Sequence, residues 1–148
     1  MRFMMLMIPK VYQNGQKAGP DLRPSAEMVE KMEKYNEELA KAGALISLDG
    51  LHPPVTGARV TFSKGKTKVT DGPFAESKEV LGGYWMIQTK SKQEAIDWIR
   101  RCPAEEGDVI ELRQVFEISD FPPDVQKAAD NPTVTAVTSK AQVARPKK

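Results

Sequence analysis

The order of the periodic segments restricts the fold of this chain more than any other feature of its sequence. That order is strand, helix, strand, hairpin, strand, helix, strand, and inspection finds no internal repeat. Two amphipathic helices can cover only one face of the sheet that these strands form. The sequence therefore predicts an α+β domain with both helices on one face of the sheet.

Caps and helical spacing mark the two helices. Ser25 is placed to cap the first helix, and Gly43 to end it. Ser91 and Glu94 form a capping box for the second helix, which stops before Pro103. The apolar stripe of the first helix consists of Met28, Met32, Tyr35 and Leu39. Both helices are thus predicted to bury one side only.

The strands are predicted from alternation and from Gly or Pro punctuation, at residues 1–8, 44–51, 59–63, 67–70, 81–89 and 109–118. Gly82 and Gly83 permit either a bulge or a close backbone approach. The alternation of the last strand slips, which predicts a bulge near Arg113 or Gln114. Continuous apolar residues at 85–87 predict a second sheet against the open face, and hence a homodimer.

Length and charge indicate one domain, residues 1–120, followed by a Pro-led, basic tail, residues 121–148. The tail is expected to be flexible, and the alternative is an arm that packs on a partner subunit. The first 120 residues hold 17 basic and 18 acidic side chains, so no excess charge attracts nucleic acid. No apolar run is long enough for a membrane span. A single cysteine, Cys102, forms no internal disulfide, and a cytoplasmic location is expected.

A longer motif resembles a known family. Asp71-Gly72-Pro73-Phe74 continues through Leu81-Gly82-Gly83-Tyr84 and is preceded by Gly50-Leu51-His52-Pro53. Together these segments resemble the YCII-related family, in the branch named for its Asp-Gly-Pro-Phe (DGPF) motif, over about residues 1–119. The resemblance implies a ferredoxin-like fold that dimerises into an α+β barrel. Members of this branch are often encoded beside extracytoplasmic-function sigma factors.

The resemblance does not transfer a reaction. In shorter members of the wider family, a histidine at the start of the first helix works with an aspartate as the proposed acid–base pair, and one relative resembles a dehydrochlorinase of hydroxyhydroquinones. The matching stretch here, Arg23-Pro24-Ser25-Ala26, contains no histidine. That pair is therefore not carried over to this chain.

His52 is the only histidine and the only side chain whose unperturbed pKa suits proton transfer near neutral pH. Asp71, also predicted at a strand end, could orient it, which makes His52 and Asp71 the candidate catalytic pair. Each also has a purely structural interpretation, as a turn residue before Pro53 or Gly72. The candidate ligand-binding residues are Asp49, Arg59, Phe74 and Tyr84.

No multi-residue His/Cys constellation and no glycine-rich phosphate loop is present, so neither a cofactor nor a metal site is predicted. Two functions from different classes remain. The first is a small cofactor-independent enzyme or small-molecule-binding protein that uses the His52/Asp71 pair. The alternative is a non-catalytic accessory or regulatory dimer that acts with a partner such as a sigma factor.

Overall fold

A four-stranded antiparallel sheet organises the chain in a computed structural model, which describes residues 1–13, 19, 21–74 and 80–143. Its strands are β1 (Arg2–Ile8), β2 (Leu45–Gly50), β5 (Gly83–Gln88) and β6 (Val109–Gln114), in the order β2-β5-β1-β6. With one helix after β1 and one after β5, this is the ferredoxin-like arrangement. The predicted fold class is confirmed.

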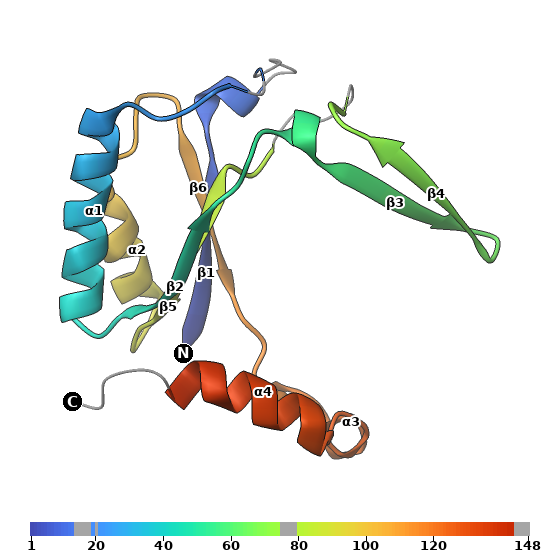
Figure 1. Ribbon diagram of the computed structural model, residues 1–148. Helices are drawn as coiled ribbons and strands as arrows, with labels where there is room; N and C mark the ends of the chain where they lie inside the picture. Colours follow the sequence, from blue (N-terminus) through green and yellow to red (C-terminus); the bar gives the residue numbers. More distant parts are fainter. Residues whose placement is uncertain (14–18, 20, 75–79, 144–148) are drawn as a thin grey trace.

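Two helices, α1 (Ala26–Lys41) and α2 (Lys92–Arg100), lie on the same face of the sheet (Figure 1). Both predicted caps are present, since Ser25 Oγ accepts from the backbone N–H of Met28 and Ser91 Oγ accepts from that of Glu94. Gly43 ends α1 with a φ of 68°, a conformation that favours glycine. Local capping chemistry therefore fixes where both helices lie along the chain.

The core lies between these helices and the alternate residues of β1 and β5. Its fully buried large side chains are Phe3, Met5, Leu39 and Ile87. Tyr35 packs edge-on against the rings of Trp85 and Trp98, with centroids 6.2 and 6.4 Å away. Each large apolar side chain buried in this way stabilises the fold by about 1.5–3 kcal/mol.

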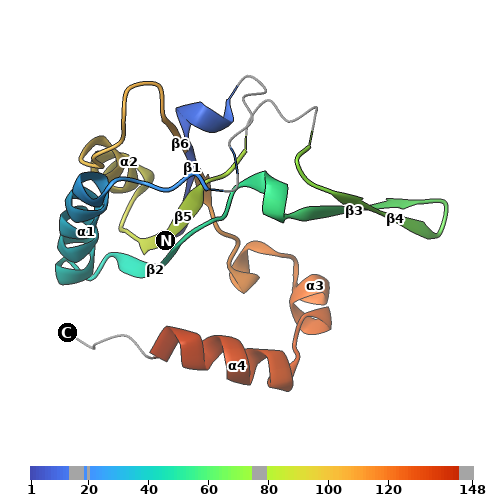
Figure 2. The ribbon, with the colours of Figure 1, turned by 45° about the horizontal axis from the view of Figure 1, so that its top comes forward.

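The other side of the sheet, called the open face below, carries an apolar centre with polar edges. Leu6 lies between Tyr84 and Glu111 across the strands, and Met4 lies between Met86 and Arg113. Leu6, Met4 and Met86 are only half-buried. Neither α1 nor α2 covers this face (Figures 1 and 2).

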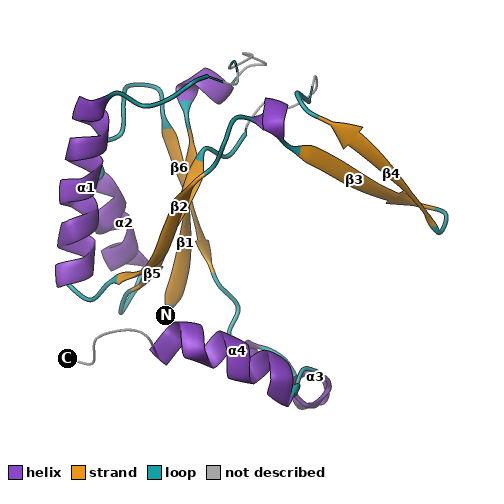
Figure 3. Ribbon diagram, viewed as in Figure 1, coloured by secondary structure: helices purple, strands orange, loops and turns teal. Residues whose placement is uncertain are grey.

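A separate hairpin projects from the body on the side of the open face (Figures 1 and 3). It consists of β3 (Ala58–Ser63) and β4 (Lys66–Asp71), joined by Lys64 and Gly65, whose φ angles are 50° and 73°. Two consecutive positive φ angles are typical of the tight turn that suits the twist of a hairpin. The predicted turn at residues 64–66 is therefore correct.

The C-terminal part differs from prediction in two respects. The bulge predicted near Arg113 or Gln114 is wrong, because β6 keeps its register with β1 and ends at Gln114. The sheet is irregular instead in β2, between Leu45 and Ser47. Beyond a short 3-10 turn, two helices that the sequence did not predict follow, α3 (Pro123–Ala128) and α4 (Pro132–Val143).

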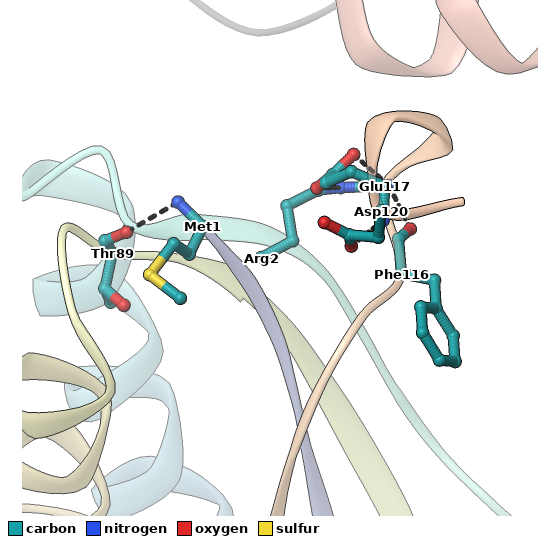
Figure 4. A network of polar contacts seen from close by, with 6 residues as sticks. All are labelled: Met1, Arg2, Thr89, Phe116, Glu117 and Asp120. Atoms are coloured by element: carbon teal, nitrogen blue, oxygen red, sulfur yellow. Dashed lines mark hydrogen bonds and ion pairs between the residues drawn. The ribbon is translucent and has the colours of Figure 1, made fainter. Parts of the chain in front are cut away.

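An ion pair fastens the segment after β6 to the first strand (Figure 4). Arg2 donates from Nε and Nη2 to the two carboxylate oxygens of Glu117, at 2.7 and 2.9 Å. Asp120 in turn accepts from the backbone N–H of Glu117 at 2.7 Å. The hydrogen bond from Arg2 holds the pKa of Glu117 below its ordinary value. This contact fixes the direction in which the chain leaves the sheet.

Candidate functional site

A cavity of about 710 Å³ lies between the first half of α1 and the end of the sheet where β1 and β2 stop and β5 starts. Cavities of roughly 300–1,000 Å³ are typical of small-molecule sites. Most of the lining is apolar. The apolar residues of the lining include Met28, Met32, Leu48 and Trp85.

Two glycines allow the chain segments around this cavity to approach closely. A Cβ on Gly82 would lie 2.5 Å from the ring of Pro9, and one on Gly83 would lie 2.9 Å from the carbonyl oxygen of Asp49. Both distances are too short for a real side chain, so glycine is required. The close approach predicted at residues 82 and 83 is confirmed, and it places the end of β1 against the start of β5.

Asn36 fixes the wall that α1 contributes. Its side chain is buried, its Oδ1 accepts from Trp85 Nε1 at 2.8 Å, and its Nδ2 donates to Glu33 at 3.1 Å. A buried amide with both ends bonded is held in one orientation. Asn36 therefore holds the Trp85 indole in place at the cavity.

Tyr12 is a buried polar side chain in the lining that has no hydrogen-bond partner among the described residues. It is 6% exposed, and within the described part of the chain its phenol makes no hydrogen bond. Burial raises its pKa, so the phenol is protonated at neutral pH and can donate. A buried donor without an acceptor costs about 1–3 kcal/mol. A ligand acceptor or a water would remove that cost.

The charges around the cavity are mainly negative. Five carboxylates line it, against the two cations Lys10 and Arg23. Within the described residues, none of these five acidic side chains makes an ion pair. Three of them accept hydrogen bonds, and only from neutral donors. The carboxylates are Glu33, Asp49, Glu105, Glu106 and Asp108. The cavity is therefore electrostatically unfavourable for an anion.

Two of the predicted ligand-binding residues, Asp49 and Tyr84, meet on the open face of the sheet, at the end where the cavity lies. Tyr84 Oη donates to Asp49 Oδ2 at 2.7 Å, and both residues contribute to the lining. The hydrogen bond to Asp49 raises the pKa of Tyr84 above its ordinary value. The structure thus brings together a carboxylate and a phenol that are 35 residues apart in the sequence.

The candidate catalytic pair lies elsewhere. His52 and Asp71 are both exposed and lie close to the 3-10 turn at Pro54–Thr56. Gly72 packs on that turn, where a Cβ would lie 1.8 Å from the carbonyl oxygen of Pro54. Neither His52 nor Asp71 lines the cavity or makes a side-chain hydrogen bond within the described residues. Their acid–base role stays a prediction.

The remaining predicted ligand-binding residues form a pair of their own. The guanidinium of Arg59 lies 4.0 Å from the centroid of the Phe74 ring. This cation–π contact joins the base of β3 to the segment after β4. Neither side chain belongs to the lining of the cavity.

The sequence did not identify Asn36 or Tyr12 as site residues. A signal existed for Asn36, which follows Met32 by four positions and so interrupts the apolar stripe of α1 with an amide. Tyr12 lies between the first predicted strand and the first predicted helix, and nothing local shows that it is buried. Long-range packing decides its position.

The described residues also bear on two other kinds of site, a metal centre and a reactive cysteine. In residues 1–13, 19, 21–74 and 80–143, no three His, Cys, Asp or Glu residues are placed to share a metal ion. Burial raises the pKa of the half-buried Cys102 thiol to about 11, which disfavours a reactive thiolate. No described helix is long and apolar enough to cross a membrane.

The family model of the YCII-related domain matches residues 1–119. An uncharacterized protein of Rhizobium meliloti (strain 1021) is 43% identical over 60 residues, which are 40% of this chain and 48% of the relative. The chain thus spans about half the length of the curated relative that it matches. The match ends before α3 and α4.

Proposed function

Because the chain belongs to the YCII-related domain family, whose matched relative is itself uncharacterized, we propose a function from the geometry: the protein binds a small molecule in the cavity between α1 and the sheet. One observation carries this proposal. The buried Tyr12 phenol lies in a largely apolar cavity and has no acceptor within the described chain. Ligand sites are typically apolar cavities that contain a small number of polar groups.

The same cavity favours one charge class of ligand. Five acidic and two basic residues belong to its lining, and the acidic side chains have no ion-pair partner in the described residues. Aromatic rings of Tyr12 and Trp85 contribute to the lining, and such rings attract cations. The proposed ligand is an apolar ring compound that carries an amine or a neutral polar group, and not a carboxylate or a phosphate.

A matched set of probes tests this proposal. The set is 2-naphthylmethylamine, 2-naphthalenemethanol and 2-naphthoate, which share one ring system and differ in charge. Titration calorimetry is expected to give affinity in the order amine, alcohol, carboxylate, with at least a tenfold difference between the ends, about 1.4 kcal/mol. Tighter binding of the carboxylate, or binding of none of the three, would contradict the proposal.

A pair of variants on α1 shows whether binding occurs in the cavity. Met28 lines the cavity, whereas Glu30 is exposed two residues further on and does not. Met28→Trp is expected to fill the space and abolish amine binding. Glu30→Trp is expected to retain it, since the added ring lies outside. Equal affinities of the two variants would place the binding elsewhere.

Several finer predictions remain proposals of their own. An acid–base reaction through His52 and Asp71 is supported by their common position next to the turn at Pro54–Thr56. Membership of the DGPF branch is supported by the motif at residues 71–74. A cytoplasmic location and a sigma-factor partner are expectations from the sequence alone.

We also propose that the protein is a homodimer. Support comes from the half-buried apolar residues at the centre of the open face, which α1 and α2 leave uncovered. Face-to-face packing of two such sheets removes this apolar surface from water. This proposal concerns assembly and is independent of what the cavity binds.

A further inference from the structure

The β3–β4 hairpin, residues 58–71, presents an apolar face that nothing in the described chain covers. Val60 lies opposite Val69, and Phe62 lies opposite Thr67 on the same face. Val60, Phe62 and Val69 are 50%, 79% and 62% exposed. Every residue of both strands is exposed. An isolated two-stranded hairpin is marginally stable in water, so an apolar contact on this face would stabilise it.

A second exposed apolar group lies at the opposite end of the sheet. Phe116 and Ile118, in the segment that follows β6, are 72% and 53% exposed. The hairpin leaves the sheet where β2 ends, and β6 runs antiparallel to β1, so the two groups lie at opposite ends of the strands. Both the hairpin and the elements after β6 extend on the side of the open face (Figure 1).

These two regions are also opposite in charge. The hairpin contains Arg59, Lys64, Lys66 and Lys68 against one acid, Asp71. Residues 115–124, called the acidic segment below, contain Glu117, Asp120 and Asp124 and no Lys or Arg. Surfaces that are complementary both in apolar area and in charge favour each other over other partners.

We propose that the hairpin is a dimerisation arm whose apolar face packs on the acidic segment of a second copy of this chain. A twofold axis perpendicular to the strands brings the hairpin end of one copy beside the β6 end of the other, so both contacts form at once. Six residues per strand make the arm roughly 20 Å long. That length exceeds the spacing of about 10 Å between packed sheets.

The inference rests on the proposed homodimer but not on the proposed ligand. The arm contributes no residue to the lining of the cavity. Loss of the dimer and loss of ligand binding are therefore separable results. The far-ultraviolet circular dichroism spectrum and the melting temperature of each variant below serve as the check that the body of the protein is intact.

Sedimentation velocity over a concentration series tests the arm in the full-length chain. Phe62→Thr/Val69→Thr removes apolar contacts while keeping residues that suit strands. The control Thr61→Ser/Thr70→Ser alters the opposite face of the arm. The first pair is expected to raise the dimer dissociation constant at least tenfold and the control less than twofold. A variant dimer as tight as the wild type, or a wild type that stays monomeric, would overturn the proposal.

A double-mutant cycle tests the contact between arm and segment. Phe116→Thr alone is expected to weaken the dimer, and combined with Phe62→Thr it is expected to add little, because both substitutions remove the same contact. Fully additive effects would show that Phe62 and Phe116 do not meet. Such a result would exclude this pairing even if the dimer itself persists.

Carbodiimide cross-linking of mixed isotope-labelled and unlabelled wild type needs no variant. It joins lysines to carboxylates in direct contact, and hybrid peptides report contacts between copies. Links between Lys64, Lys66 or Lys68 and Asp120 or Asp124 of another copy are expected. Intermolecular links elsewhere, with none between these groups, would contradict the arm.

Discussion

At the scale of single residues, the amide of Asn36 joins α1 to the sheet at the cavity. Asn36 bonds Trp85 and Glu33 at once and lies on the buried side of α1. Its amide is the only described side-chain acceptor within hydrogen-bonding distance of the Trp85 indole. The position of Trp85 at the cavity therefore depends on Asn36.

Asn36→Ala is expected to lower the free energy of unfolding by about 1–3 kcal/mol, since it leaves the buried Trp85 N–H without an acceptor. For a domain of this size the melting temperature falls on the order of 5 °C. Calorimetry measures the change. Gln93→Ala, which removes an exposed amide from α2, is the control with no expected loss. Equal melting temperatures of the two variants would show that Asn36 is not a structural contact.

Sequence reasoning reached part of the site at this scale. Asp49 and Tyr84 were predicted as ligand-binding residues, and the structure joins them in one hydrogen bond on the open face, at the end of the sheet where the cavity lies. Tyr12 was missed because its burial depends on packing between segments far apart in the chain. The role of a polar residue in a site depends on its neighbours in space, and these cannot be predicted from the local sequence pattern.

At the scale of elements, the sequence correctly predicted helix caps and a hairpin turn, which depend on a few neighbouring residues. The caps at Ser25 and Ser91 and the turn at residues 64–66 are where the sequence placed them. The end of β6 was wrong because a slip in alternation was interpreted as a bulge, whereas it marks the end of the strand. Helices α3 and α4 were missed because their sequences show no sustained apolar period.

The Arg2–Glu117 pair gives a pH-dependent prediction for the segment after β6. Arg2 lowers the pKa of Glu117 in the folded state. The contribution of the ion pair to stability is therefore present above the ordinary pKa of Glu117, and it disappears as the pH falls through the lowered pKa. Because Glu117 is 42% exposed, the contribution is less than about 1 kcal/mol.

Glu117→Gln is therefore expected to destabilise the protein slightly at pH 7, and the difference from the wild type is expected to shrink as the pH falls toward 3. Urea unfolding at both pH values measures the difference. Glu94→Gln, which alters a carboxylate that bonds only a nearby backbone N–H, is the control for general loss of a charge. A difference that persists undiminished at pH 3 would contradict the role of the ion pair.

At the scale of the whole molecule, the order of elements was sufficient to predict the layers. Two helices between four strands leave one face covered and one open, as the structure shows. The cavity could not be predicted in this way. It depends on how closely Pro9 approaches Gly82 and on the volumes of side chains from α1 and the sheet. These quantities exist only once the layers are packed.

Nitrogen–proton NMR during titration with 2-naphthylmethylamine tests the central claim most directly. The account predicts that the largest shifts occur at the Trp85 indole and the Asn36 side-chain amide, which are bonded to each other at the cavity. The Trp98→Phe variant identifies which indole signal belongs to Trp85. Unchanged Trp85 and Asn36 signals at a saturating concentration of the amine would contradict the account.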